Sequence, residues 1–256
     1  MIKTVAPALK ALVENLIDYA GLFPPASVPL EEALANYKNY EGGERSWMLN
    51  WFVVPGGDLE QVPGQYDRKL SVLGASDCDR AATIESKAVV EAQRPVYCEV
   101  APGDKESLDK VKAAGNCAKI RCGGVVPEAI PSVEAVRDFI LDCADRKLAF
   151  KATAGLHHPL RAEQALTYAD DAPRAVMHGF INVLLAAAFA WHGDRDILPI
   201  LKEEDTGAFR FDDRAHYKDR SLSLEQIKEA RQDFIHSIGS CSFNEPVEDL
   251  ETLGLL

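Results

Sequence analysis

The stretch Leu148-Ala-Phe-Lys-Ala-Thr-Ala-Gly-Leu-His-His-Pro159 predicts a β-strand that ends at Gly155 and is followed by two histidines. Side chains of a strand alternate between its two faces. The apolar residues of this strand would face covering helices, while Lys151 and Thr153 would point into the fold. A lysine inside a fold needs either an ion-pair partner or a function. The stretch therefore predicts an enzyme built around Lys151.

Strand and helix patterns alternate along most of the chain, which predicts parallel strands joined by crossovers. Eight such strands favour a single-domain α/β fold, a (β/α)8 TIM barrel over residues 1–256, with an N-terminal helix at 7–16 and an insertion at 208–212 before strand eight. No G-x-G-x-x-G follows the first strand, which disfavours a dinucleotide-binding fold. Strands are expected near residues 18, 50, 72, 98, 120, 151, 176 and 241, and helices at 29–40, 78–92, 104–114, 132–146, 160–169, 182–190, 224–237 and 245–253.

The composition is that of a soluble globular protein, with 47% hydrophobic and 27% charged residues. A formal net charge of −12 argues against nucleic acid and against anionic membrane surfaces as partners. The most apolar stretch, Leu184 to Trp191, is too short to span a bilayer. There is no signal-peptide pattern and no CxxC pair, which predicts a cytoplasmic protein with reduced thiols. The sequence also allows a homo-oligomer. The cysteines are Cys78, Cys98, Cys117, Cys122, Cys143 and Cys241.

Charged side chains gather on the inner face of three consecutive strands. By alternation, Glu99 points inward on the strand near residue 98, Lys119 and Arg121 on the next, and Lys151 on the one after that. Their positions near the carboxyl ends of the strands match the rim where barrel active sites lie. The grouping predicts a common pocket.

One acid and three bases leave an excess of positive charge inside the barrel. A buried ion-pair network is one interpretation, provided that a further acid such as Asp18 on strand one reaches the cations. Burying an unpaired charge costs several kcal/mol per ion. An anionic ligand, or a lysine with a lowered pKa, resolves the excess more readily, so we favour the functional interpretation.

Lys-Ala-Thr-Ala-Gly at 151–155 resembles class I aldolases of the deoxyribose-phosphate aldolase type. The resemblance implies a barrel with a Schiff-base lysine on its sixth strand. That family carries a further lysine on strand seven, and residues 175–180 contain none. The segments 17–26, 151–159 and 239–243 also resemble an uncharacterised group of bacterial barrel proteins, which implies no activity.

The leading hypothesis is a lyase that acts on a small anionic carbonyl compound through Lys151 and without a cofactor. Lys119 and Arg121 would lower the pKa of the amine, because a neutral amine is the nucleophile. Glu99 or His157 would move protons, and Arg121 would also hold a carboxylate or phosphate.

Further residues are expected to contact the substrate at the rim. Cys241 lies between two serines before a helix, a position that activates thiols. Residues 23–25 are expected to form a wall of the site, and residues 212–216 a lid over it. The expected substrate-binding residues, besides Arg121, are Asn50, Thr153, His178, Ser240 and Cys241.

Two alternatives stay open at this stage. Asp18, His157 and His178 would form an oxygen and nitrogen site for a divalent metal in a hydrolase or isomerase, although the H-x-H pattern of amidohydrolase barrels is missing. A non-catalytic barrel that binds a metabolite is the other alternative.

Overall fold

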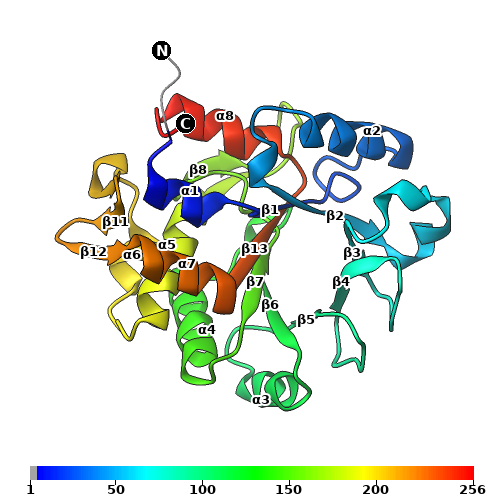
Figure 1. Cartoon of the computed structure of the whole chain (residues 1–256). Helices are drawn as coiled ribbons and strands as arrows, with labels where there is room; N and C mark the ends of the chain where they lie inside the picture. The colour runs from blue at the N-terminus through cyan, green and yellow to red at the C-terminus, as the bar shows by residue number, and fades with distance from the viewer. Residues whose placement is uncertain (1–4) are drawn as a thin grey trace.

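Eight parallel strands close into a barrel in the computed structural model, which describes residues 5–256 (Figure 1). Neighbouring strands pair in the order β1-β13-β7-β6-β5-β4-β3-β2. The prediction of a TIM barrel is therefore confirmed. Along the chain the barrel strands are β1 (Ile17–Tyr19), β2 (Leu49–Pro55), β3 (Leu70–Leu73), β4 (Ala81–Ser86), β5 (Val96–Glu99), β6 (Cys117–Arg121), β7 (Phe150–Thr153) and β13 (Ile235–Ser240).

Helices cover the outside of the barrel, and α4 shows how the sequence sets them. The Ser132 hydroxyl accepts a backbone N–H of the first turn, while Phe139, Ile140 and Cys143, spaced by one and three residues, are buried. Ser223 caps α7 in the same way. The helices are α1 (Pro7–Val13), α2 (Leu30–Glu41), α3 (Lys105–Ala113), α4 (Val133–Asp145), α5 (Phe180–Trp191), α6 (Leu198–Lys202), α7 (Leu224–Asp233) and α8 (Asn244–Thr252).

The expected number of eight barrel strands is correct, but only because one missed strand and one wrongly included strand offset each other. The helix expected at 78–92 is wrong, because this segment contains barrel strand β4. The strand expected near residue 176 is β9 (Arg174–Met177), which pairs with β8 (Ala162–Ala165) in an antiparallel hairpin outside the barrel. That hairpin also replaces the helix expected at 160–169. The last barrel strand begins at residue 235, earlier than expected.

The corrected count changes the strand numbers of the two central lysines. Counted along the chain, Lys119 on β6 lies on the sixth barrel strand, and Lys151 on β7 lies on the seventh. The two residues are register partners in the parallel β6–β7 ladder. They therefore lie side by side at one level of the barrel.

The expected insertion before the last strand is present as an antiparallel sheet of β10 (Phe209–Phe211), β11 (Arg214–Tyr217) and β12 (Arg220–Ser223). The sheet lies beside α1, where the Ala8 N–H donates to the Asp212 carbonyl over 3.1 Å. Residues 212–216 line no part of the main cavity, so the expectation of a lid there is wrong.

The apolar stretch around α5 is buried within the protein. Helices α4, α6 and α7 pack against α5, whose side chains are apolar on nearly all sides. Over residues 5–256, no helix combines the length and the apolar character needed to cross a bilayer.

Candidate active site

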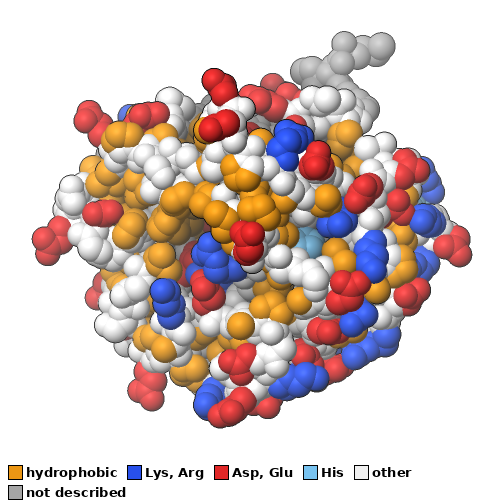
Figure 2. Space-filling model, turned by 180° about the vertical axis from the view of Figure 1, so that it is seen from behind, with side chains coloured by type: hydrophobic (Ala, Val, Ile, Leu, Met, Phe, Trp, Pro, Cys, Tyr) orange, Lys and Arg blue, Asp and Glu red, His pale blue; other side chains and the backbone are white. Residues whose placement is uncertain are grey.

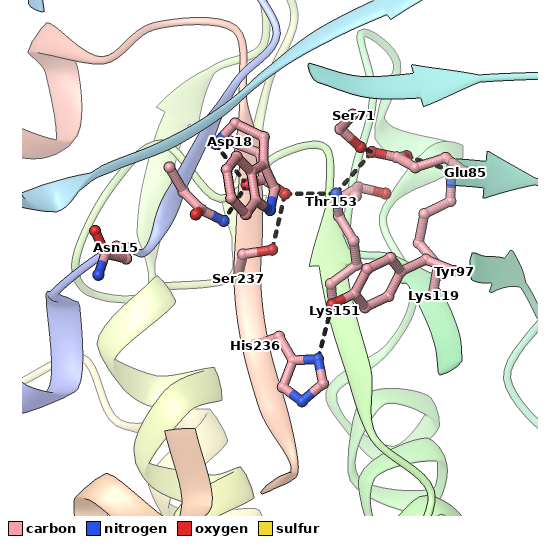
Figure 3. Close-up of polar contacts among 12 residues, drawn as sticks. Asn15, Asp18, Ser71, Glu85, Tyr97, Lys119, Lys151, Thr153, His236 and Ser237 are labelled. Atoms are coloured by element: carbon pink, nitrogen blue, oxygen red, sulfur yellow. Dashed lines mark hydrogen bonds and ion pairs between the residues drawn. The ribbon is translucent and has the colours of Figure 1, made fainter. Parts of the chain in front are cut away.

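A network of buried charges fills the barrel interior around Lys151 (Figure 3). The Lys151 ammonium is fully buried and lies 2.5 Å from Asp18 Oδ2 and 2.6 Å from Glu85 Oε1. The other oxygen of Glu85 lies 3.0 Å from the Lys119 ammonium. Glu85 therefore holds both lysines, one on each carboxylate oxygen.

Both ammonium groups of this network are paired with carboxylates without a ligand. Lys119 also pairs with Glu99 Oε2 over 3.1 Å, so three carboxylates surround two ammonium groups. The expected excess of positive charge inside the barrel is therefore wrong. Asp18 does reach Lys151, and Glu85 is the further acid that sequence reasoning missed.

The network fixes the ionisation of its members. Burial alone would lower the pKa of Lys151, but the carboxylates of Asp18 and Glu85 outweigh burial and raise it above the ordinary value. Burial likewise opposes the charge of Glu85, but Lys151 and Lys119 outweigh it and lower the pKa of Glu85 to about 2. At neutral pH Lys151 is therefore an ammonium ion whose lone pair is not free for nucleophilic attack.

Neutral polar groups complete the hydrogen bonds of the two buried carboxylates. The Asn50 amide donates to Asp18 Oδ1 over 2.7 Å, and the Ser237 hydroxyl donates to Asp18 Oδ2 over 2.8 Å. The Ser71 hydroxyl donates to Glu85 over 2.9 Å. The structure does not place Asn50 on the cavity wall, because its amide is directed to Asp18.

A cavity of about 450 Å³ opens at the carboxyl ends of the barrel strands. Lys119, Arg121 and Thr153 line it, as expected, and so does the loop at residues 23–25. Lys151 does not line it. Figure 2 shows hydrophobic side chains gathered on the upper part of one face, around a hollow where basic and acidic side chains are visible.

Arg121 differs from the two central lysines in its surroundings. Its side chain is exposed at the end of β6 and lines the cavity. Among residues 5–256 no carboxylate forms an ion pair with it. A cation without an acidic partner at a cavity mouth is suited to hold an anionic ligand.

The part of the cavity wall that follows β7 and β13 carries His157 and Cys241. His157 Nδ1 lies 3.2 Å from Glu245 Oε2 and 3.1 Å from the Ser240 hydroxyl. Cys241 Sγ lies 3.9 Å from both ring nitrogens. His158 also borders the cavity, but its Nδ1 pairs with Asp249 over 2.6 Å. Both Ser240 and Cys241 are thus close to the imidazole of His157.

The expected metal ligands do not come together. The Asp18 carboxylate forms an ion pair with Lys151. His178 donates from Nε2 to the Pro131 carbonyl over 2.8 Å and does not line the cavity. In the part of the chain that the structure describes, no group of three or more His, Cys, Asp or Glu side chains is placed to hold a metal ion. His178 is likewise not placed to contact a substrate in this cavity.

Comparisons with known proteins do not add a family to this description. No model of a protein family matches the chain, and searches of curated proteins and of solved structures find no significant match.

Proposed function

We propose that this chain is an enzyme that acts on a small anionic carbonyl compound, as a carbon–carbon lyase that uses the amine of Lys119. The observation that carries the proposal is the placement of Lys119 and Arg121 on the wall of one cavity, two residues apart on β6. The guanidinium would hold the anionic end of the substrate while the amine meets the carbonyl. The cavity volume of about 450 Å³ suits a small molecule.

The nucleophile in this proposal is Lys119 and not Lys151, because only Lys119 reaches the cavity. The resemblance to class I aldolases implies a Schiff-base lysine on the sixth strand and a further lysine on the seventh. Lys119 and Lys151 occupy these strands. The presence of one lysine on each of these two strands supports the proposal. The Lys-Ala-Thr-Ala-Gly segment, however, lies on the seventh barrel strand, whereas the resemblance implies the sixth.

The network around Lys119 offers a route for the proton that the amine must lose. Glu99, with a side chain 27% exposed, lies 3.1 Å from the ammonium and would accept this proton. The second ammonium, at Lys151, shares Glu85 with Lys119.

In the proposed reaction, Lys119 Nζ forms a bond to the carbonyl carbon and the carbonyl oxygen leaves as water. The resulting iminium would accept the electron pair of the bond between the α and β carbons, which breaks as the β-hydroxyl loses its proton and becomes a carbonyl group. The enamine left on Lys119 would then take up a proton, and hydrolysis by water would release the second product and the free amine. His157, which lines the same cavity, would exchange protons with the substrate.

Borohydride trapping tests the proposal. We expect pyruvate and glyoxylate to leave a reduced adduct that peptide mass mapping places on Lys119. The proposal fails if no tested carbonyl compound labels Lys119, or if exposed lysines such as Lys105 are labelled to the same extent.

Variants of two arginines test the anion site in the same assay. Arg121→Met should lower trapping of pyruvate by about tenfold, the loss of one charge-assisted contact, and leave trapping of neutral propanal unchanged. Arg195→Met is the matched control, because Arg195 is exposed, pairs with Asp145 and does not line the cavity. Equal loss for pyruvate and propanal would contradict a role for Arg121 in binding the anion.

The remaining expectations stay predictions. They are a cytoplasmic location, partners limited to small molecules and to copies of the chain itself, and the alternative of a non-catalytic binding barrel.

A further inference from the structure

A second set of reactive side chains lines the same cavity as Lys119. His157 follows β7, Cys241 follows β13, Glu245 lies in the first turn of α8 and Tyr168 lies in the connection of the β8–β9 hairpin. All four line the cavity. The Tyr168 hydroxyl lies 3.7 Å from Cys241 Sγ, and Cys241 is 5% exposed. The fold thus brings a thiol and an imidazole from distant segments to one wall.

The hydrogen bonds decide which nitrogen of His157 faces the sulfur. The Ser240 hydroxyl donates to the Ser242 carbonyl over 2.6 Å, so it accepts from Nδ1 of His157. Glu245 Oε2 also accepts from Nδ1. Nδ1 therefore carries a proton. Within residues 5–256 the one recorded polar contact of Nε2 is Cys241 Sγ, which leaves Nε2 to exchange a proton with the thiol.

We propose that Cys241 and His157 form a thiol–imidazole pair through which the cavity binds small electrophilic carbonyl compounds covalently. The sulfur electron pair forms a bond to the carbonyl carbon, and the π pair of the carbonyl moves to its oxygen. The thiol proton passes to Nε2 of His157 and from there to that oxygen. The step consumes no other reactant and does not depend on the amine of Lys119.

The surroundings of His157 favour its charged form. Burial of the ring opposes the charge, but the hydrogen bonds that the ring donates to Cys241 and Glu245 outweigh burial and raise the pKa of His157 to about 9. Further titratable groups near the pair are Tyr168 on the hairpin, Tyr19 on β1 and His158, whose ring centre lies 6.4 Å from that of His157. An imidazolium beside a thiol stabilises the thiolate, which is the nucleophile.

Other cysteines of the chain provide internal controls. Burial raises the pKa of Cys117 to about 11 and that of Cys122 to about 12. These thiols are therefore inert at neutral pH. Cys78 is half-buried and, among the described residues, no histidine contacts its thiol. Cys78 therefore serves as the reference thiol, with more access to solvent than Cys241.

Timed alkylation with iodoacetamide, followed by peptide mass mapping, tests the proposal in the intact protein. An ordinary thiol is about 1% thiolate at pH 6.5, so we expect Cys241 to react about tenfold faster than Cys78 at this pH. His157→Gln should remove this advantage. The proposal is overturned if Cys241 reacts no faster than Cys78, or if His157→Gln leaves its rate unchanged.

If His157→Gln does not fold, the pH dependence of the Cys241 alkylation rate in the unmodified protein tests the proposal instead. A rate for Cys241 that is nearly constant from pH 6 to 8 supports the pair, and a rise of about tenfold per pH unit, as for an ordinary thiol, overturns it. Borohydride adducts at Lys119 are read from a different peptide. Failure of either reaction is therefore distinguishable from failure of the other.

Discussion

Replacing Glu85 with glutamine should destabilise the fold strongly, because Glu85 is the acid that both buried lysines share. Its carboxylate lies 2.6 Å from Lys151 and 3.0 Å from Lys119, and Ser71 donates to it over 2.9 Å. Glutamine keeps the size of the side chain but removes its charge. Two ammonium groups would then lie in the barrel interior with one shared partner fewer.

The lowered pKa of Glu85 sets the magnitude. Its ordinary value of 4.5 falls to about 2 in the folded protein, where Lys151 and Lys119 outweigh the effect of burial. At about 1.4 kcal/mol per pH unit, this difference corresponds to about 3 kcal/mol of the free energy of unfolding. Because the folded-state pKa is the lower one, this stability is present above pH 4.5 and is lost as the pH falls towards 2.

Urea denaturation followed by circular dichroism measures the effect. At pH 7 the Glu85→Gln variant should lose about 3 kcal/mol, and its stability should change less than that of the unmodified protein between pH 4.5 and 2. Glu99→Gln is the matched control, because Glu99 is 27% exposed and contacts only Lys119 among the charged groups of the network. It should cost less than about 1 kcal/mol. Equal losses for the two variants would refute this account of the network.

Three further predictions concern single groups. Lys151→Met should lower the free energy of unfolding, measured by urea denaturation, by about 3–5 kcal/mol, because two buried carboxylates lose their cation. Adding Asp18→Asn should recover part of this loss, and no recovery would contradict the ion pair. Gly155→Ala should cost more than about 1 kcal/mol of the free energy of unfolding, because Gly155 has a φ of +71° and an added Cβ would lie 2.8 Å from the backbone of a facing glycine. Gly193→Ala should cost less, because Gly193 has a φ of +91° but open space around it. The reverse order of the two losses would contradict the close approach at Gly155. By NMR, His157 should titrate near pH 9. Because its folded-state pKa is raised, its contribution to the free energy of unfolding is complete below pH 6.5 and is lost as the pH rises through 9. Titration near pH 6.5 would contradict the contacts of His157 with Glu245 and Cys241.

The inward faces of three barrel strands follow from the sequence because the pleat of a strand fixes the alternation. Lys119 and Lys151 point into the barrel as expected, Glu99 pairs with Lys119, and Arg121 and Thr153 line the cavity. These residues lie in strands whose outward positions are continuously apolar, so the two faces are easy to tell apart.

The acid at the centre of the network was missed because Ala81–Ser86 was assigned to a helix. The β-branched pair at Thr83 and Ile84, followed by Glu85, is the signal that favours a strand there. Alternation from Ile84, which is buried outside the barrel lumen, places Glu85 on the inner face.

The sequence pattern alone does not predict which of the two lysines lines the cavity. Lys119 and Lys151 are register partners with the same alternation, and they differ in their acidic neighbours on other strands. Likewise the contact of His157 with Cys241 and Glu245 depends on how two segments far apart in the chain meet above the barrel.

A crystal structure of the protein after reaction with pyruvate and borohydride tests the central claim most directly. The account predicts continuous density from Nζ of Lys119 into the cavity, with the carboxylate of the adduct against the Arg121 guanidinium. An adduct on Lys151, or pyruvate bound without contact to either Lys119 or Arg121, would contradict it.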